Sequence, residues 1–487
     1  MTQTHIILLL ISALTSPSSW ATTTDMPGDL IDFTTSGYGL LALAIFVICY
    51  IFVIAEDKTH LSKSKPVMVG AGVIWILVGL AYASTGDYQT AGDELRAAIL
   101  EYAELFLFLL SAMTFVHMME ERHVFLAIRS WLIDRNFSLR RVFWLTGAIT
   151  FCLSPVADNL SAALLMGSVV MTVGSKTPKF VSLGCLNVVI AANAGGVFSP
   201  FGDITSLMVW QAGHISFSEF LLLFPSALVN WLVPAVILGC YVPNGPPQTA
   251  HKRQQMKKGG LIVSGLFIST AALSVSVHSQ LGLPPVLGMM TGLGVLKLYG
   301  YYLSHHDPML HEMELRQHHA DALASTRPTK GDHIQVVRRF DIFRVVERAS
   351  WDTLMFFYGI VLCVGGLSTL GYLHLVSTEL YGTFGMTFAN LIIGLSSSLV
   401  DNIPIMYAVL AMEQTLPTYQ WLLVTLAVGT GGSLLAIGSA AGVALMGQAS
   451  GIYTFRSHLQ WSWAILLGYL LSCALQVGIA KVLGLGV

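Results

Sequence analysis

Two aspartate–asparagine pairs, each beside a proline, stand in the middle of long apolar runs. The first is Asp158-Asn159 and the second is Asp401-Asn402. An aspartate at the centre of a membrane helix costs roughly 2.5–3.5 kcal/mol, so an ionisable residue in such a place usually marks a functional site. The two pairs lie 243 positions apart (401 − 158), which suggests that the chain is built from two related halves.

Two glycine-rich stretches carry further polar side chains in similarly apolar surroundings. The first, 193–196, is followed by Asp203, and the second, 429–432, is followed at the matching place by Ser439. Glycine frees the backbone, and an unwound backbone inside a membrane has to be buried in protein or line a cavity. Both stretches therefore predict helices that break around a cavity.

The polar side chains of these four segments form an oxygen-rich set that suits a hard cation, and they lack the His and Cys residues that transition metals prefer. The set comprises Asp158, Asn159, Ser161, Asn193, Ser199, Asp203, Thr205, Ser206, Ser397, Ser398, Asp401, Asn402, Ser433 and Ser439. Ser154, Ser396 and Thr430 lie in the same segments, but a bond to their own backbone is an equally good expectation for them. No Lys or Arg stands among these residues, so we expect no fixed cation beside the carboxylates.

The composition is that of a membrane protein. Of the 487 residues, 54% are hydrophobic and only 11% are charged, where an average soluble protein has about 25% charged residues. The net charge of −2 gives no basic surface for nucleic acid. The six cysteines of the chain stand singly in apolar segments, without the paired spacing of a disulfide framework or metal site. We expect no cofactor.

Hydropathy predicts an all-α polytopic membrane protein. Ordinary helices are expected near 38–55, 67–84, 98–117, 219–240, 259–277, 285–303, 352–368 and 460–480. The segments 141–171 and 384–413 hold a polar centre, and because about 20 residues are needed for one crossing we interpret them as re-entrant hairpins. A kinked pair of ordinary spans is the alternative. The segments 180–212 and 420–450 are the glycine-broken helices.

The distribution of Lys and Arg sets the orientation. With 38–55 starting outside, the loops 56–66, 118–140, 174–179, 241–258, 304–350 and 451–459 fall in the cytoplasm. Counted with Arg141 at the edge of the second loop, they hold 22 of the 25 Lys and Arg residues, as the positive-inside rule expects. Arg96 and Lys481 are left outside, and Lys297 lies within a helix.

Each half then crosses the membrane three times, and the second half starts from the opposite face, which is an inverted repeat. The two Asp-Asn tips should meet near the midplane. The expected organisation is a signal peptide over 1–21 (or an uncleaved extra helix), N-terminal scaffold helices over 22–97, a first inverted repeat over 98–240, two linking helices and a cytoplasmic loop over 241–350, and a second inverted repeat over 351–487.

The negative charge of three carboxylates in a membrane has to be balanced by a bound cation or by protons, since burial favours the protonated form of a carboxyl group. A proton and a small metal cation therefore compete for the same group, and such competition with alternating access is an antiport mechanism. Na⁺ is expected at Asp158 and Asp203, with Asp401 tuning or sharing the site. Glu104 and Asp352, expected near the ends of their helices, are candidates for a proton path.

The segments 154–168 (SPVADNLSAALLMGS), 193–206 (NAGGVFSPFGDITS) and 396–406 (SSSLVDNIPIM) resemble the NhaD-type sodium/proton antiporters of the ion transporter superfamily. The likeness covers nearly the whole chain after residue 21. It implies a bacterial inner-membrane antiporter that exports Na⁺ or Li⁺ in exchange for H⁺, and a homodimer in the lipid bilayer. It also implies that the ion and proton residues are Asp158, Asn159, Asp203, Thr205, Asp401 and Asn402.

Two other functions compete with antiport. Sodium-coupled uptake of a dicarboxylate or another anion occurs in the same superfamily, but the Asp before each Asn places negative charge where an anionic substrate would sit. An intramembrane aspartyl protease is a remote alternative, because Phe201-Gly202-Asp203 lacks the first glycine of the Gly-x-Gly-Asp element. We therefore expect a transporter and not an enzyme.

Overall fold

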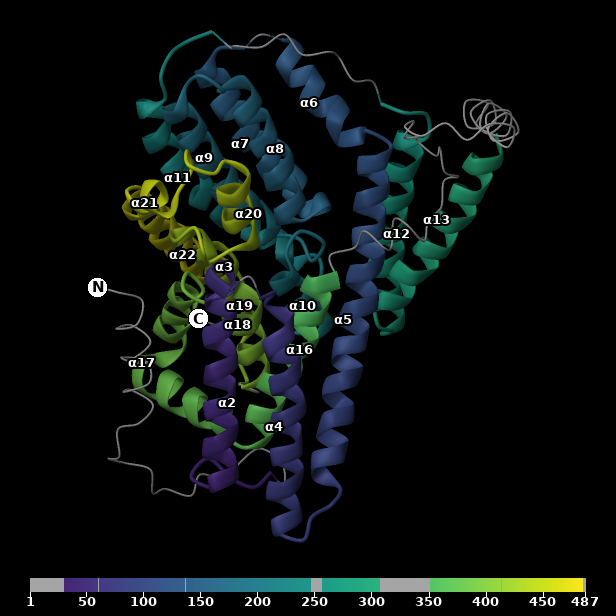
Figure 1. Cartoon of the computed structure of the whole chain (residues 1–487), viewed down its shortest axis with the longest axis vertical. Helices are drawn as coiled ribbons and strands as arrows, with labels where there is room; N and C mark the ends of the chain where they lie inside the picture. The colour runs from purple at the N-terminus through teal and green to yellow at the C-terminus, as the bar shows by residue number, and fades with distance from the viewer. Residues whose placement is uncertain are drawn as a thin grey trace, which may run out of the picture.

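The computed structural model describes residues 30–59, 61–135, 137–246, 256–306, 351–412 and 414–484, and all regular structure within these ranges is helical (Figure 1). The elements are α2 Gly37–Ile54, α3 Glu56–Thr59, α4 Ser64–Ser84, α5 Thr90–Glu121, α6 Val124–Asp134, α7 Leu139–Ala157, α8 Asn159–Val173, α9 Pro178–Gly196, α10 Ile204–Gln211, η1 Glu219–Leu223, α11 Phe224–Tyr241, α12 Gly260–Leu281, α13 Val286–His306, α16 Trp351–Thr369, α17 Tyr372–Ser396, α18 Asn402–Ala411, α19 Thr418–Gly431, η2 Gly432–Leu434, α20 Ala440–Gln448, α21 Phe455–Leu459 and α22 Ser462–Leu483. The expected signal peptide over 1–21 lies outside the described residues.

Eight helical segments of the described ranges are long and apolar enough to cross a membrane, which confirms the predicted all-α polytopic fold. They are α2, α4, α5, α9, η1 with α11, α12, α16 and α22. Helix α5 is longer than the predicted 98–117: its 32 residues span roughly 48 Å, more than the ~30 Å of a hydrocarbon core. Glu104 therefore lies in the middle of a helix, and the expectation that it stands near a helix end is wrong.

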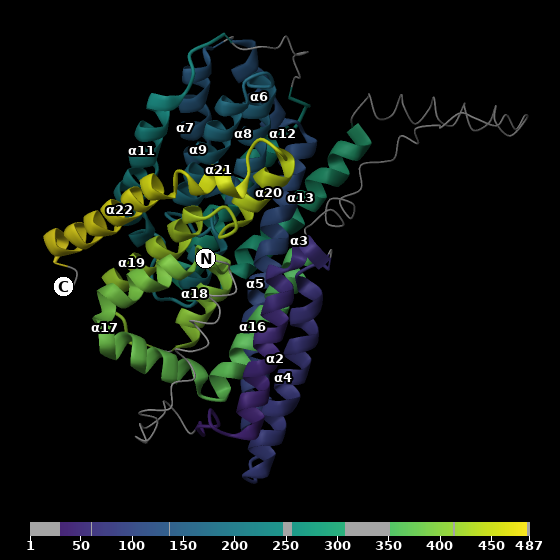
Figure 2. The same ribbon diagram turned by 60° about the vertical axis from the view of Figure 1, so that its left-hand side comes forward.

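Both segments interpreted as hairpins are interrupted at their Asp-Asn pair. Helix α7 ends at Ala157 and α8 begins at Asn159, and the two arms pack side by side in both views (Figures 1 and 2). In the other half, α17 bends at Gly385, where φ is 70°, and ends at Ser396, before α18 begins at Asn402. The direction from which each hairpin enters the membrane, and the proposed domain boundaries, stay predictions.

Both glycine-rich stretches interrupt their helices. The first break runs from α9 to α10 over residues 197–203, and the second runs from α19 through the short η2 to α20. At each break the chain returns against itself: a Cβ on Gly202 would lie 2.8 Å from the carbonyl oxygen of Gly196, and a Cβ on Gly438 would lie 2.7 Å from that of Gly432. Only glycine permits this approach without displacing the backbone.

The contacts between hairpin and broken helix recur in the two halves. The Ser154 hydroxyl donates to the carbonyl of Ala192 at 2.6 Å, and the Ser397 hydroxyl donates to the carbonyl of Val428 at 2.9 Å. The two serines are 243 positions apart (397 − 154), the offset of the Asp-Asn pairs, and the two carbonyls are 236 apart (428 − 192). Since Gly202 and Gly438 also differ by 236, one arrangement of contacts is built twice.

The remaining helices surround these elements. Helices α7, α8, α9 and α11 gather at one end of the molecule and α2 and α4 lie toward the other, while α5 runs past both groups (Figures 1 and 2). Helices α12 and α13 pack against each other and against α5. Helix α4 contacts both α2 and α16. The linking helices and the N-terminal helices thus enclose the hairpins and breaks from different directions.

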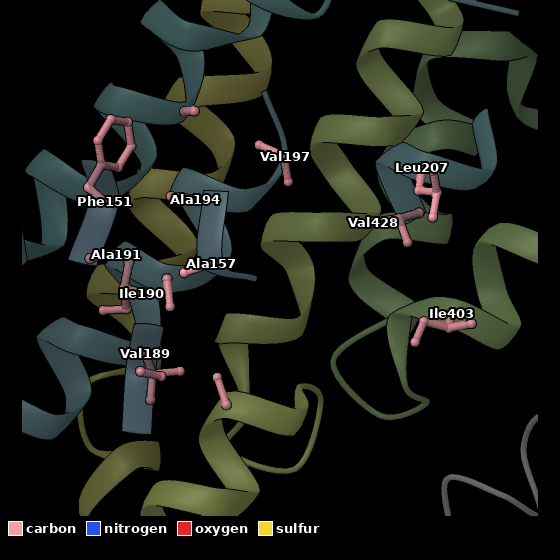
Figure 3. Packing of buried hydrophobic residues seen from close by; sticks show 14 of the residues in the cluster. Phe151, Ala157, Val189, Ile190, Ala191, Ala194, Val197, Leu207, Ile403 and Val428 are labelled. Carbon is pink, nitrogen blue, oxygen red and sulfur yellow. The ribbon is translucent and has the colours of Figure 1, made fainter. Parts of the chain in front are cut away.

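Buried apolar side chains fill the space where the hairpins meet the broken helices. Figure 3 shows Phe151 and Ala157 from α7, Ile190 and Ala194 from α9, Leu207 from α10, Ile403 from α18 and Val428 from α19, all of them buried. Fully burying one such large aliphatic or aromatic side chain stabilises a structure by about 1.5–3 kcal/mol. This packing fixes the positions of the polar helix ends beside it.

Candidate functional site

Four helix N-termini carry the residues that the sequence singles out. Asp158, Asp203, Asp401 and Ser439 are the N-cap residues of α8, α10, α18 and α20. The positive end of a helix dipole stabilises a carboxylate there by about 0.3–1 kcal/mol, and by up to ~2 kcal/mol in partly buried sites. The fold therefore places three anionic groups where their charge is tolerated, and one hydroxyl in the fourth position.

All three carboxylates line one cavity of about 130 Å³. Asn159, Ser161 and Asn402 also line it, whereas Thr205 and the other serines of the predicted set do not. Helix α5 contributes Phe108 and His117, and α16 contributes Phe357. The scaffold side of the cavity is thus largely apolar, and the side of the helix ends supplies oxygen ligands.

Asp158 occupies the break of the first hairpin in an unusual backbone conformation. Its φ is 58° and its ψ is 160°, and it shares positive φ with only one other non-glycine residue of the described ranges, His123. The Ser161 N–H and hydroxyl both donate to its carboxylate, each at 2.9 Å. Such backbone strain costs of order 1–3 kcal/mol and is characteristic of functional sites.

Asp203 lies deeper, with 5% of its surface exposed. The Asn402 amide donates to its two carboxylate oxygens at 3.4 and 3.2 Å, so the first broken helix is linked directly to the tip of the second hairpin. The Thr205 N–H donates to Asp203 at 3.2 Å. The buried Thr205 hydroxyl lies beside the same carboxylate and makes no well-formed hydrogen bond to any described residue. Its position beside the buried carboxylate makes the Thr205 oxygen a candidate ion ligand.

We expect Thr205→Val to separate ion binding from stability. Valine has nearly the shape of threonine, and an unsatisfied buried hydroxyl costs about 1–3 kcal/mol, so the variant should unfold at the same or a higher temperature than the wild type. If the hydroxyl is an ion ligand, the KM for Na⁺ should rise about tenfold. Equal KM values in the variant and the wild type would remove Thr205 from the site.

A chain of side-chain contacts joins the two halves beside the cavity. The Asn159 amide donates to the Asn193 carbonyl oxygen at 3.4 Å, and the Asn193 amide donates to the Ser433 hydroxyl at 2.8 Å. His458 Nε2 donates to the backbone carbonyl of Ser433 at 2.9 Å, which leaves Nδ1 to accept from the Tyr453 hydroxyl at 2.7 Å. His458 and Tyr453 are buried supports that sequence reasoning missed, because they lie in a short connection without a recognisable motif.

The other predicted serines hold the breaks through hydrogen bonds with the backbone. Ser199 donates to Pro155, Ser206 to Val197, Ser397 to Gly394 and Val428, and Ser398 to Leu395, while Ser439 accepts from the Gly442 N–H. Ser396 and Thr430 bond to carbonyls of their own helices, as was equally expected. Each of these hydroxyls bonds to the backbone, so the serines position the helix ends.

Lys63 overturns one expectation from the sequence. Its ammonium group lies 3.7 Å from a carboxylate oxygen of Asp401 and lines the same cavity as Asp158 and Asp203. The prediction of no fixed cation beside the carboxylates is therefore wrong. Lys63 immediately precedes α4, far from every motif in the sequence, so that only the packing of α4 against the rest of the molecule reveals its place.

Neither candidate for a proton path lines the cavity of the three aspartates. Glu104 lines a second cavity of about 190 Å³ together with Glu101 and Tyr407, whose hydroxyl donates to Glu101 at 3.1 Å. Asp352 is in the first turn of α16, as expected, and accepts a hydrogen bond from the Ser64 hydroxyl. The structure does not bring Glu104 and Asp352 into contact with the three aspartates, and their role in proton transfer stays a prediction.

Comparison with known proteins gives the relatives of the chain. The family model described as "Citrate transporter" (CitMHS) matches residues 33–429. The Na⁺/H⁺ antiporter NhaD of Vibrio cholerae is 50% identical over 471 residues, covering 97% of this chain and 98% of that protein. NhaD of Halomonas elongata is 46% identical over 472 residues, with coverage of 97% and 94%.

Among solved structures, the YdaH transporter of Alcanivorax borkumensis aligns with 86% of this chain and 100% of that one, at 14% identity and a TM-score of 0.44, which is too low to establish a shared fold. The relatives of near 50% identity span almost the full length of both partners. The chain belongs to the citrate transporter family and, within it, to the NhaD Na⁺/H⁺ antiporters.

Proposed function

We propose that the protein exports Na⁺, and also Li⁺, in exchange for H⁺ through the cavity lined by Asp158, Asp203 and Asp401. The observation that carries this proposal is the convergence of three N-cap carboxylates on one small cavity, in a chain whose full-length relatives are named Na⁺/H⁺ antiporters. Carboxylate, amide and hydroxyl oxygens are the ligands of hard cations. The same carboxylates accept protons, so one group serves both ions in turn.

The exchanging ion is placed between Asp158 and Asp203. Asp158 receives two hydrogen bonds from Ser161, and Asp203 is held by Asn402 and stands beside the Thr205 hydroxyl. Asp401 tunes or shares the site, and in this arrangement it is paired with Lys63. Na⁺ binding at the carboxylates displaces protons, and proton binding displaces Na⁺.

Uptake of an organic anion is the second candidate, because the family model is named for citrate and because Lys63 supplies a cation at the cavity. The charges of the cavity argue against it. Three carboxylates face one ammonium group, so an incoming carboxylate meets a net negative site. Bidentate Arg residues, the usual ligands of a carboxylate substrate, do not line the cavity within the described residues.

Reconstitution in liposomes distinguishes Na⁺/H⁺ antiport from uptake of an organic anion. Purified protein in liposomes that contain a pH indicator should move protons when a Na⁺ or Li⁺ gradient is imposed, and a K⁺ gradient and protein-free liposomes serve as controls. Antiport is rejected if neither gradient moves protons. Counterflow of labelled citrate or succinate, with no proton movement driven by Na⁺ alone, would favour the anion transporter instead.

We further infer a location in the bacterial inner membrane and assembly as a homodimer. The membrane location is supported by the eight apolar helices and by the bacterial origin of the NhaD relatives. The dimer is supported by the resemblance to the ion transporter superfamily. Cell fractionation and the mass of the protein–detergent particle test these two inferences separately.

A further inference from the structure

We propose that Lys63 is a tethered cation that competes with the transported cation for Asp401. This inference rests on the proposed function and adds a residue that sets the affinity of the site. It starts from the position of the lysine: the ammonium nitrogen is 3.7 Å from Asp401 and 4.6 Å from the ring centroid of Phe356. The face of an aromatic ring attracts a cation. Lys63 is thus held on two sides at the wall of the cavity.

Lys63 and Asp401 belong to different parts of the fold. Asp401 caps α18 at the tip of the second hairpin, whereas Lys63 immediately precedes α4. Helix α4 is fastened to α16 along its length: Trp75 donates to the carbonyl of Leu362 at 2.8 Å, and Tyr82 donates to the carbonyl of Thr369 at 3.0 Å. The lysine is therefore carried on a firmly packed scaffold, and its pair with Asp401 crosses from that scaffold to the hairpin.

The start of α4 is held as well. The Ser64 hydroxyl donates to Asp352 on α16, and the Lys63 N–H donates to Glu56 at 3.4 Å. These contacts fix the backbone from which the Lys63 side chain extends. Asp352, a candidate for the proton path, thus has a structural role as well: its bond to Ser64 anchors the segment that carries Lys63.

The pair is only partly buried, with 23% of the Lys63 side chain and 20% of the Asp401 side chain exposed. Partly exposed ion pairs of this kind contribute little, so a transported cation can displace the lysine. Other charged or titratable groups that line the cavity or adjoin the pair are Asp158, Asp203, His117, Glu56, Asp352 and Tyr50. None of these supplies a second fixed ammonium or guanidinium group at the cavity, among the described residues.

Removal of the tethered cation should tighten Na⁺ binding. In Lys63→Gln proteoliposomes at fixed pH we expect the KM for Na⁺ to fall about fivefold, which is the equivalent of ~1 kcal/mol, and the kcat to fall because Na⁺ leaves the site more slowly. Lys63→Arg keeps the charge and should keep the KM near that of the wild type. Lys65→Gln is the matched control, because Lys65 is exposed, lies in the first turn of the same helix and does not line the cavity.

Chemical restoration of the charge separates competition from a structural effect. Lys63→Cys, made after substitution of the exposed Cys152 and Cys240, should show the lowered KM. Modification with a methanethiosulfonate that carries an ammonium group should raise the KM again, and the sulfonate-bearing reagent should not. In an Asp401→Asn background, Lys63→Gln should have no further effect on the KM.

The inference is overturned if the KM of Lys63→Gln stays within twofold of the wild type, if Lys65→Gln lowers it equally, or if the ammonium reagent does not raise it. In each of these cases the wild type still exchanges Na⁺ for H⁺. Failure of the proposed function would instead appear as wild-type liposomes without exchange. Stabilisation of the detergent-solubilised protein by Na⁺ against heating gives a reading that does not depend on transport: the Na⁺ concentration for half of the effect should be lower in Lys63→Gln.

Discussion

Asp158→Asn and Asp203→Asn should each lower Na⁺/H⁺ exchange at least about 100-fold, the scale of loss when a group that transfers a proton is removed. An amide neither carries the negative charge that holds Na⁺ nor takes up the exchanged proton. The fold should survive, because asparagine caps helices as well as aspartate does. Asparagine also has nearly the shape of the aspartate that already adopts the positive φ at position 158. Initial rates of Na⁺-driven proton movement in proteoliposomes measure the effect.

Asp93→Asn is the matched control for this prediction. Asp93 forms an exposed pair with Arg96 on α5 and does not line the cavity, so its replacement should leave exchange unchanged. Asp401→Asn should have a smaller effect than the two site variants, because Asp401 is already paired with Lys63. Near-normal exchange in both Asp158→Asn and Asp203→Asn, in protein that elutes as a single folded species, would contradict the assignment of the site.

The three aspartates were predictable because charge is rare in this chain. A carboxylate within an apolar run is unlike an ordinary surface charge and indicates a functional role. The repetition of the Asp-Asn pair predicted that each half of the chain would contain a similar hairpin tip. Glycine and proline marked the breaks, since these residues change what the backbone can do. The structure has a helix break in each of the four segments. Ser154 and Ser397 make similar contacts and are separated by the same number of positions as the two Asp-Asn pairs.

Lys63 and His458 were not predictable from the sequence by the same reasoning. Lys63 stands in a polar connection with two other lysines nearby, where a positive charge is ordinary. Its contact with Asp401 arises from two segments 338 positions apart (401 − 63) and depends on how α4 packs against α16. His458 likewise gains its role only from burial against Ser433. Local pattern identifies residues that are unusual where they stand, but not ordinary residues brought to a site by tertiary packing.

The second prediction concerns the glycines at the two breaks. Gly202→Ala would place a Cβ 2.8 Å from the carbonyl oxygen of Gly196 and 2.8 Å from the Cα of Pro155. Gly438→Ala would place one 2.7 Å from the carbonyl oxygen of Gly432 and 2.7 Å from the Cα of Ser398. All of these neighbours are backbone atoms, so that no side chain can rotate away.

Each substitution should therefore force the break and the hairpin tip apart. Overpacking of this kind costs about 1–3 kcal/mol, and we expect the temperature of half-unfolding to fall by several degrees and exchange to be lost. The measurements are the thermal stability of the purified protein and the initial rate in proteoliposomes. Gly79→Ala is the matched control: Gly79 lies within α4 with no atom near its added Cβ, and alanine there should be neutral or stabilise by up to about 1 kcal/mol.

The comparison of the two glycine variants also tests whether exchange depends on the helix breaks of both halves. Gly202 lies next to Asp203, a carboxylate of the proposed ion site, whereas Gly438 lies next to Ser439, which only caps α20. Loss of exchange in both would mean that the geometry of the second break is needed even though it brings no charge, as expected from the contact of Asn193 with Ser433. Normal exchange in Gly438→Ala, with loss in Gly202→Ala, would mean that only the first break, beside Asp203, has to keep its geometry for exchange.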